Sequence, residues 1–250
     1  MSLVPDPTAA AESAQSLAEL NRWLAGLRAG QRIEWALQSL SGEHALSSSF
    51  GAQSAVALHM ATRIRADLPV ILVDTGYLFP ETYRFVDELT HRLDLSLHVV
   101  RPDPAQAWDG ASVAALASLG TEGIDRYNRV HKVEPMQRAL RDLGVRTWIA
   151  GLRRGQSSTR ANLDFLELKE GRWKLHPLAD WTQRDIGRYL ARHGLPFHPL
   201  WEHGYVSIGD THSTRPLGPG MEEEDTRFFG LKRECGLHFD EPQSGVRFGT

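Results

Sequence analysis

The one cysteine of the 250-residue sequence lies in the stretch KRECGLH, close to the carboxyl terminus. A lone cysteine is most often a buried small hydrophobe, but Cys235 has Lys232, Arg233, Glu234 and His238 around it in the sequence. Cationic neighbours raise the thiolate fraction of a cysteine, and Glu234 acts in the opposite direction. On balance this setting predicts a nucleophilic thiol.

Two polar stretches carry residue types that bind phosphate or sulfate. The first is SSSFG, which consists of Ser47, Ser48, Ser49, Phe50 and Gly51. Hydroxyls and free N–H groups at the start of a helix favour an anion, although serines and glycines also form ordinary turns. The second is GLRRGQSSTR, which supplies Gly151, Arg153, Arg154, Gln156, Ser157 and Arg160. Its guanidinium groups can fork onto phosphate or sulfate oxygens; the alternative is a solvated basic loop.

A third polar stretch, DTG, contains Asp74, Thr75 and Gly76. The first two side chains either cap the following helix or hydrogen-bond a ribose or an adenine edge. The P-loop pattern and the Gly-x-Gly-x-x-Gly fingerprint are both absent from the sequence. We therefore expect neither a P-loop nucleoside triphosphatase nor a dinucleotide dehydrogenase.

Composition excludes several other classes. A formal net charge of −3 argues against general nucleic-acid binding, and a single cysteine cannot hold zinc or an iron–sulfur cluster. The eleven histidines show no paired ligand spacing, so we expect no metal site. No run of 18 apolar residues and no basic, apolar leader occurs, so we expect neither membrane insertion nor secretion. A reducing cytoplasm fits best.

The elements that must position these residues alternate along the chain. Apolar runs predict strands in ALSSSFG and at 70–73, 95–100, 146–152 and 172–178, and helical spacing predicts helices at 52–64, 80–93, 127–143 and 182–194. Two further helices, broken at RAG, are expected within residues 11–40. This order predicts an α/β fold in which a parallel sheet has helices on both faces.

The three polar stretches each follow a predicted strand, at the strand ends where such sheets bind ligands. We expect an amino-terminal helical extension over residues 1–43, a nucleotide-binding α/β domain over 44–220, and a mobile carboxyl-terminal tail over 221–250 that carries Cys235.

These stretches occur together with VDTGYLFPETY, HKVEPMQRAL, HPLWEHGYVSIGDTHSTR and RFFGLKRECGLH. In this order, from Ala45 to His238, they resemble the assimilatory 3'-phosphoadenylyl-sulfate (PAPS) reductases and the related adenylyl-sulfate (APS) reductases. The resemblance implies an adenine-nucleotide α-hydrolase-like fold, an enzyme of sulfate assimilation and cysteine biosynthesis, and a homodimer.

Departures from related patterns refine this resemblance. Cluster-containing adenylyl-sulfate reductases have cysteines where this chain has Tyr127-Asn128 and residues 210–213, so no iron–sulfur cluster is expected. The acidic first loop of ATP pyrophosphatases is absent from residues 49–54, which argues against ATP hydrolysis. Gly155 replaces a glutamate found in many relatives and leaves the arginine loop more cationic and more flexible.

The resemblance also implies roles for individual residues. The loops at 47–51 and 151–160 would hold phosphate groups of PAPS, the DTG stretch would position the adenosine, and Lys132 would bind the sulfated end. Attack by Cys235 on sulfur would leave an S-sulfocysteine and release adenosine 3',5'-bisphosphate. Arg227 and His238 would neutralise charge on the sulfonate and the leaving nucleotide.

No second cysteine exists to resolve this intermediate, so an external dithiol, thioredoxin or glutaredoxin, must release sulfite. A mobile tail would cover the substrate for the first step and swing outward for the second. Two other interpretations stay open. One is a cluster-free adenylyl-sulfate reductase, and the other is a non-catalytic nucleotide-binding module in which Cys235 forms an intersubunit disulfide.

Overall fold

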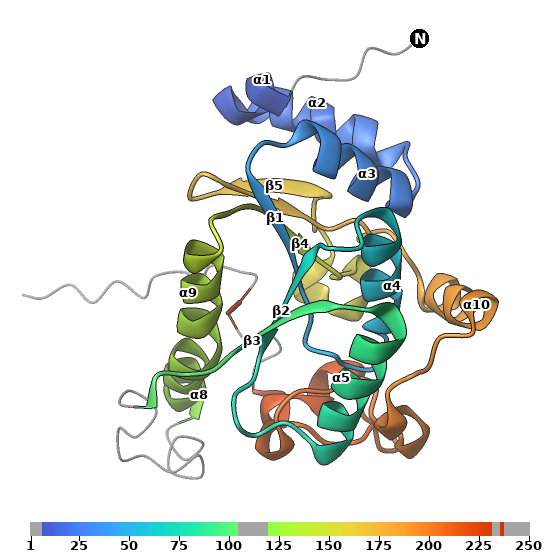
Figure 1. Ribbon diagram of the computed structural model, residues 1–250. Coiled ribbons are helices and arrows are strands. Elements are labelled where there is room, and N and C mark those ends of the chain that lie inside the picture. Colours follow the sequence, from blue (N-terminus) through green and yellow to red (C-terminus); the bar gives the residue numbers. More distant parts are fainter. Residues whose placement is uncertain (1–6, 105–119, 232–235, 238–250) are drawn as a thin grey trace, which may run out of the picture.

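The computed structural model describes residues 7–104, 120–231 and 236–237. The described residues form a six-stranded sheet in the order β3-β2-β1-β4-β6-β5 (Figure 1). Its strands are β1 (Glu43–Ser47), β2 (Pro69–Val73), β3 (Ser96–Val100), β4 (Val145–Ala150), β5 (Leu166–Lys169) and β6 (Arg172–Leu175). Neighbouring strands run parallel, except that β5 is antiparallel to β6. The predicted parallel sheet is confirmed, with one antiparallel strand added at its edge.

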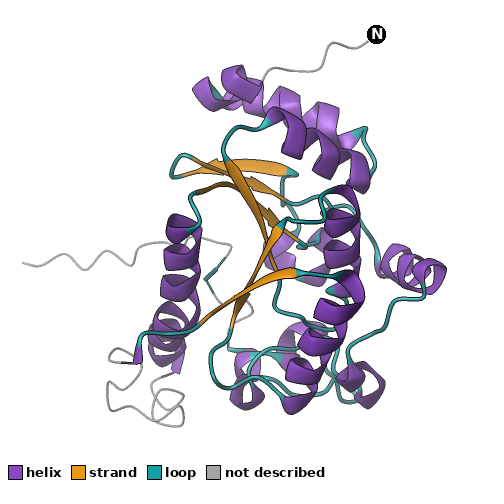
Figure 2. Cartoon of the chain, viewed as in Figure 1, coloured by secondary structure: helices purple, strands orange, loops and turns teal. Residues whose placement is uncertain are grey.

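Helices cover both faces of this sheet, as predicted (Figure 2). The described helices are α1 (Pro7–Glu12), α2 (Ala14–Ala25), α3 (Ala29–Ser39), α4 (Ala55–Ile64), α5 (Pro80–Leu93), α8 (Gly120–Asn128), α9 (Glu134–Asp142) and α10 (Gln183–His193). Val70 and Leu72 of β2 belong to the larger core, with α4 and α5, whereas Ile71 belongs to a second cluster with α9. Because both faces are covered, the strand reads as a continuous apolar run.

The direction in which the chain crosses the sheet reverses at β1. From β1 the chain continues through β2 to β3 on one side, and it then returns to place β4 on the other side of β1. The loops that leave β1 and β4 therefore diverge at the carboxyl ends of these strands, where α/β sheets bind their ligands. The SSSFG and RRGQSSTR stretches follow these two strands.

Helix α10 begins and ends at residues whose side chains explain its limits. Thr182 and Asp185 form a capping box, in which the Thr182 hydroxyl accepts from the Asp185 N–H and the Asp185 carboxylate accepts from the Thr182 N–H. Gly194 ends the helix in the left-handed conformation at φ 60°. The predicted cap and terminal glycine of this helix are confirmed.

The helical structure predicted for residues 127–143 is confirmed as far as Asp142, but it is not one regular α-helix. Helix α8 ends at Asn128, a π-helical turn, η1, spans Arg129–Val133, and α9 begins at Glu134. A π-helical turn contains an extra residue and shifts the side chains around the helix. Within this turn the consecutive residues His131 and Lys132 are both buried.

Strand β5 is an element that the sequence pattern did not predict. It joins β6 through Glu170 and Gly171, whose φ angles of 50° and 70° match a tight two-residue hairpin turn. Only four residues long and alternately charged, LELK lacks the continuous apolar run that marks the inner strands.

The amino-terminal helices pack on the same core as the sheet. Leu20 and Leu24 of α2 and Ile33 of α3 are fully buried in the larger cluster. Two helices are confirmed here, but the break between them covers Gly26 to Arg28, because Ala29 and Gly30 of RAG already belong to α3. Helix α1 was not predicted. Asn21 of α2 pairs with both backbone groups of Leu166, its Nδ2 donating to the carbonyl at 2.8 Å and its Oδ1 accepting from the N–H at 2.9 Å.

Beyond Leu195 the described chain is irregular, as expected. It contains the short 3-10 turns η4 (Pro199–His203), η5 (Thr211–Ser213), η6 (Glu223–Thr226) and η7 (Phe228–Gly230). Isolated bridges pair Leu78 with Asp210 and Thr214 with Arg227. Cys235 and His238 lie outside the described residues. Across the described ranges, no helix has the length and apolar character needed to cross a membrane.

Candidate active site

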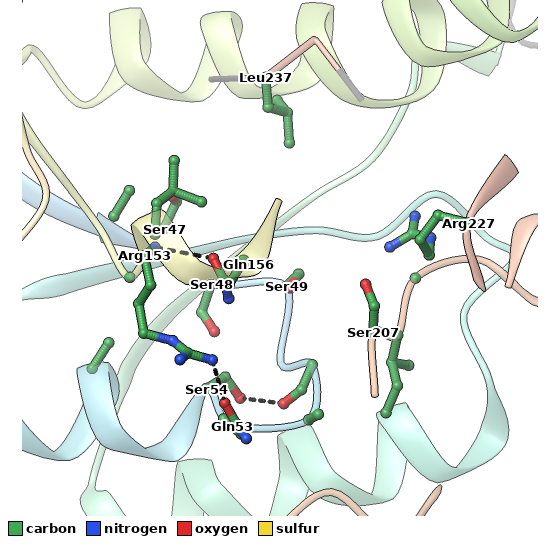
Figure 3. A pocket seen from close by; sticks show the side chains of 18 of the residues that line it. Ser47, Ser48, Ser49, Gln53, Ser54, Arg153, Gln156, Ser207, Arg227 and Leu237 are labelled. Carbon is green, nitrogen blue, oxygen red and sulfur yellow. Dashed lines mark hydrogen bonds between the residues drawn. The ribbon is translucent and has the colours of Figure 1, made fainter. Parts of the chain in front are cut away.

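A cavity of about 270 Å³ lies where the loops after β1 and β4 diverge. The loop after β1, the end of β4, the arginine loop, the segment 206–210 and the carboxyl-terminal segment all contribute to its wall. Figure 3 shows Arg153 and Gln53 on one side of it and Arg227 with Ser207 on the other. Among the predicted site residues, the lining includes Ser47, Ser48, Ser49, Gly51, Thr75, Lys132, Gly151, Arg153, Gln156, Arg160 and Arg227.

The serine loop is held in place by its own hydrogen bonds. Ser47 Oγ accepts from Trp148 Nε1 at 2.7 Å, Ser48 Oγ accepts from the Phe50 N–H at 3.1 Å, and Ser54 Oγ donates to the Gly51 carbonyl at 3.0 Å. Phe50 turns the chain with a φ of 49°, and its side chain is fully buried in the core. Phe50 is therefore not among the lining residues, and its neighbours present hydroxyls to the cavity.

The arginine loop enters the cavity with two guanidinium groups. Arg153 Nη2 donates to Gln53 Oε1 at 2.6 Å and to Gln183 Oε1 at 3.3 Å, and Arg160 Nη1 donates to Gln156 Oε1 at 2.6 Å. Burial lowers the pKa of Arg153, which the Glu223 carboxylate partly opposes. The amide oxygens of Gln53, Gln183 and Gln156 orient these guanidinium groups without carrying a charge. The Glu223 carboxylate lines the same cavity.

Two predicted members of this loop do not line the cavity. Arg154 Nε donates to the Leu163 carbonyl at 2.8 Å, and its guanidinium lies 4.7 Å from the centre of the Phe165 ring. Ser157 Oγ pairs with Thr159 Oγ1 at 2.8 Å. Gly151, which does line the cavity, packs closely on α4, because a Cβ there would lie 3.1 Å from that of Ala57.

The DTG stretch separates into two parts. Thr75 lines the cavity, whereas Asp74 and Gly76 do not. The Asp74 carboxylate accepts from Tyr83 at 2.7 Å, Arg101 at 2.9 Å and the Gly76 N–H at 3.0 Å. Burial alone would raise the pKa of Asp74, but these donors lower it. Helix α5 has Phe79 as its N-cap, so neither Asp74 nor Thr75 caps it.

A buried ion pair forms another part of the wall. Lys132 Nζ lies 2.6 Å from Asp210 Oδ2, and both side chains are almost fully buried. Asp210 also accepts from Thr75 Oγ1 at 2.5 Å and from the Tyr127 hydroxyl at 3.2 Å. Burial alone would raise the pKa of Asp210, but the Lys132 ammonium and these hydrogen bonds lower it to about 2. Asp210 is thus a carboxylate at neutral pH.

Aromatic rings surround this ion pair. The Lys132 ammonium lies 5.4 Å from the centre of the Tyr127 ring and 5.1 Å from that of Phe228, within the range of cation–π attraction. The Tyr127 ring stacks on His131 at 4.3 Å and meets His212 edge-on at 4.9 Å. Burial lowers the pKa of both histidines, which favours their neutral forms.

The carboxyl-terminal segment reaches the cavity. Leu237 lies in its wall and packs on the second core cluster, opposite the serine loop in Figure 3. Arg227 lines the cavity next to Gly209, whose missing side chain leaves room for the guanidinium. The sequence places Leu237 two residues after Cys235.

Sequence reasoning missed Gln53, Gln183 and Asp210 as parts of the wall. Gln53 follows the serine loop directly, so its nearness to that loop was a usable signal. Asp210 lies in an irregular stretch without periodicity, and Gln183 opens a helix far along the chain, so only the fold brings them here. Within the described ranges, no group of three or more His, Cys, Asp or Glu side chains is placed to hold a metal ion.

Comparison with known proteins agrees with this architecture. The solved structures that are similar to this chain include the following two. One is phosphoadenylyl-sulfate (PAPS) reductase from Candida auris in a phosphate complex, with a TM-score of 0.66 and 28% identity over 81% of this chain and 98% of that one. The other is Candida glabrata FMN adenylyltransferase, with a TM-score of 0.54 and 18% identity over 82% and 74% of the two chains, a similarity of fold alone.

Relatives found by sequence are more similar to this chain than these two structures are. The phosphoadenosine 5'-phosphosulfate reductase of Xanthomonas campestris pv. campestris is 58% identical over 240 residues, which cover 96% of this chain and 100% of the relative. That of Shewanella oneidensis is 58% identical over 224 residues, which cover 90% and 91%. The family model for the phosphoadenosine phosphosulfate reductase domain matches residues 43–216. This chain therefore belongs to the phosphoadenosine phosphosulfate reductase family.

Proposed function

We propose that the protein is an enzyme of sulfate assimilation that reduces PAPS to sulfite and adenosine 3',5'-bisphosphate. The observation that carries the proposal is the set of cations on one cavity at the switch point of the sheet: Lys132, Arg153, Arg160 and Arg227. PAPS brings several negative charges, and charged hydrogen bonds from such groups are the strong ones. Membership of the family supports the same substrate.

The two sides of the cavity take different ends of the substrate in this proposal. The serine loop, Arg153 and Arg160 bind phosphate groups, and Lys132 and Arg227 bind the sulfonate end. Thr75 contacts the nucleotide directly. The DTG residues Asp74 and Gly76 act through the shape of the loop that holds Thr75, because the Asp74 carboxylate is already occupied by protein donors.

Cys235 is the nucleophile in the proposed reaction. Its thiolate attacks the sulfur of the sulfonate, a bond forms between the two sulfur atoms, and the bond from sulfur to the phosphate oxygen breaks. Adenosine 3',5'-bisphosphate leaves with the electron pair, and the enzyme keeps an S-sulfocysteine. The position of Leu237 in the cavity wall supports a tail that brings Cys235 to the substrate. His238 would neutralise charge on the leaving nucleotide.

An external dithiol completes the cycle. One of its thiolates attacks Sγ of the S-sulfocysteine and displaces sulfite, and its second thiol then breaks the mixed disulfide and restores the Cys235 thiol. The dithiol, thioredoxin or glutaredoxin, is oxidised to a disulfide and supplies both electrons. We also propose that the enzyme works in the cytoplasm, as a homodimer and without a bound cofactor.

The decisive experiment mixes reduced protein with PAPS in the absence of a reductant and measures the mass of the intact chain and of the peptide that contains Cys235. The expected result is one added sulfonate on Cys235, followed by sulfite release when reduced thioredoxin is added. Tight nucleotide binding with no sulfonate on Cys235 would instead support a non-catalytic nucleotide-binding module.

A further inference from the structure

The Asp210 carboxylate is an unexpected group in this cavity. It lines the wall, and its side chain is 1% exposed. A carboxylate repels a polyanionic substrate, so its presence beside the proposed sulfonate site calls for a physical reason. The contacts of Asp210 supply one.

Asp210 is fixed from three directions. Thr75, which follows β2, donates to Oδ1 at 2.5 Å, and Tyr127 of α8 donates to Oδ2 at 3.2 Å. The backbone is held too, because Asp210 forms a β-bridge with Leu78, and the next residue, Thr211, donates its N–H to the Tyr77 carbonyl at 2.9 Å. The carboxylate therefore has little freedom to follow a moving partner.

Lys132 is the partner that depends on this fixed carboxylate. Its ammonium lies 2.6 Å from Asp210 and faces the rings of Tyr127 and Phe228. Two buried opposite charges in contact stabilise each other, and removal of one leaves the other buried without its partner. An ammonium has three donors. One goes to Asp210, and the others can turn to an anion in the cavity.

We infer that Asp210 is a positioning residue, which aims the Lys132 ammonium at the sulfonate end of the substrate, with Thr75 and Tyr127 fixing the carboxylate. This inference rests on the proposed function and adds a residue to it. Asp210 supports the reaction only through Lys132, so its removal causes no further loss of activity once the lysine is absent.

A double-mutant cycle tests this dependence. Asp210→Asn, Lys132→Met and the double variant are compared by kcat/KM for PAPS and by the affinity for adenosine 3',5'-bisphosphate, which has no sulfonate. We expect Asp210→Asn to lower kcat/KM about tenfold or more, the cost of one hydrogen bond to a charged group. In the Lys132→Met background the same change should cause no further loss of kcat/KM, and nucleotide affinity should be unchanged in all three variants.

Asp180→Asn is the matched control. Asp180 is paired with the buried Arg32 at 2.7 and 2.8 Å and is not a lining residue of the cavity. Its loss should reduce thermal stability and leave kcat/KM unchanged.

The outcomes separate the two claims. A wild-type protein that forms no sulfite from PAPS removes the proposed function and the inference together. If the wild type turns over PAPS, the inference alone fails when kcat/KM of Asp210→Asn equals that of the wild type. It also fails when Asp210→Asn lowers kcat/KM equally with Lys132 and with Met at position 132, or when the affinity for adenosine 3',5'-bisphosphate falls together with kcat/KM.

Discussion

The Arg153 guanidinium donates to the side-chain oxygen of Gln53 at 2.6 Å and so joins the loop after β4 to the loop after β1. These residues are a hundred positions apart in the sequence, and the contact spans the point where the strand order reverses. The acceptor is a neutral amide, which leaves the positive charge of Arg153 uncompensated by this partner.

Gln53→Glu should weaken substrate binding. A carboxylate at this position would pair with Arg153 and add negative charge to a cavity proposed to bind a polyanion. We expect KM for PAPS to rise about tenfold or more, the equivalent of one lost charged hydrogen bond. Steady-state kinetics on the purified variant measure this directly.

Gln31→Glu provides the control for that variant. Gln31 also accepts from an arginine, Arg28, but it lies in α3, away from the cavity. Equal KM values for wild type and Gln53→Glu, or an equal rise in both variants, would contradict the assigned role of Gln53.

Cys235→Ser should abolish sulfite formation while nucleotide affinity is retained. A serine hydroxyl is a far weaker nucleophile than a thiolate at neutral pH and cannot form the S-sulfocysteine. Sulfite production with thioredoxin as reductant, together with calorimetric titration of adenosine 3',5'-bisphosphate, measures both properties. Appreciable turnover by the variant would show that another group carries the reaction.

Discrimination between the two nucleotides distinguishes a PAPS reductase from a cluster-free adenylyl-sulfate reductase. If arginine side chains bind the 3'-phosphate, its absence should cost about 1.5–3 kcal/mol for each charged hydrogen bond. We therefore expect kcat/KM for PAPS to exceed that for adenylyl sulfate by more than tenfold. Similar values for the two substrates would favour the adenylyl-sulfate interpretation.

His198 should make the fold sensitive to mild acid. It is fully buried, with Nε2 bonded to the Thr82 hydroxyl at 3.0 Å and Nδ1 accepting from the Leu200 N–H at 3.1 Å, and burial lowers its pKa to about 4. The unfolded chain, whose histidines titrate near 6.5, binds the extra proton first as the pH falls. The contribution of His198 to the free energy of unfolding should thus be complete above pH 6.5 and decline toward pH 4, by about 3 kcal/mol.

Urea unfolding at a series of pH values measures this slope, and His198→Gln should flatten it. His91, an exposed histidine of α5, provides the matched control, since His91→Gln should leave the slope unchanged. A wild-type slope that His198→Gln does not alter would assign the acid sensitivity to other groups.

Sequence reasoning succeeded where local chemistry decides the structure. The continuous apolar run of β2 follows from burial on both faces, and the limits of α10 follow from Thr182 and Gly194, which act within one turn of the chain. For the same reason the serine and arginine stretches could be assigned to the carboxyl ends of strands.

Sequence reasoning failed where the position of a residue depends on distant partners or on the direction of its side chain. The π-helical turn that buries both His131 and Lys132 leaves no mark in the apolar spacing. Phe50 and Arg154 belong to the expected stretches, but one packs into the core and the other lies over an aromatic ring. The place of Asp210 beside Lys132 is a product of the tertiary fold.

The side chain of Asn21 has a consequence beyond the packing of α2. An edge strand of a sheet has unpaired N–H and C=O groups, to which a strand of another molecule can add. On β5, Asn21 satisfies both such groups of Leu166, as a neighbouring strand would. One amide side chain from the amino-terminal helices thereby occupies the pairing groups of Leu166, which a strand of another molecule would otherwise use.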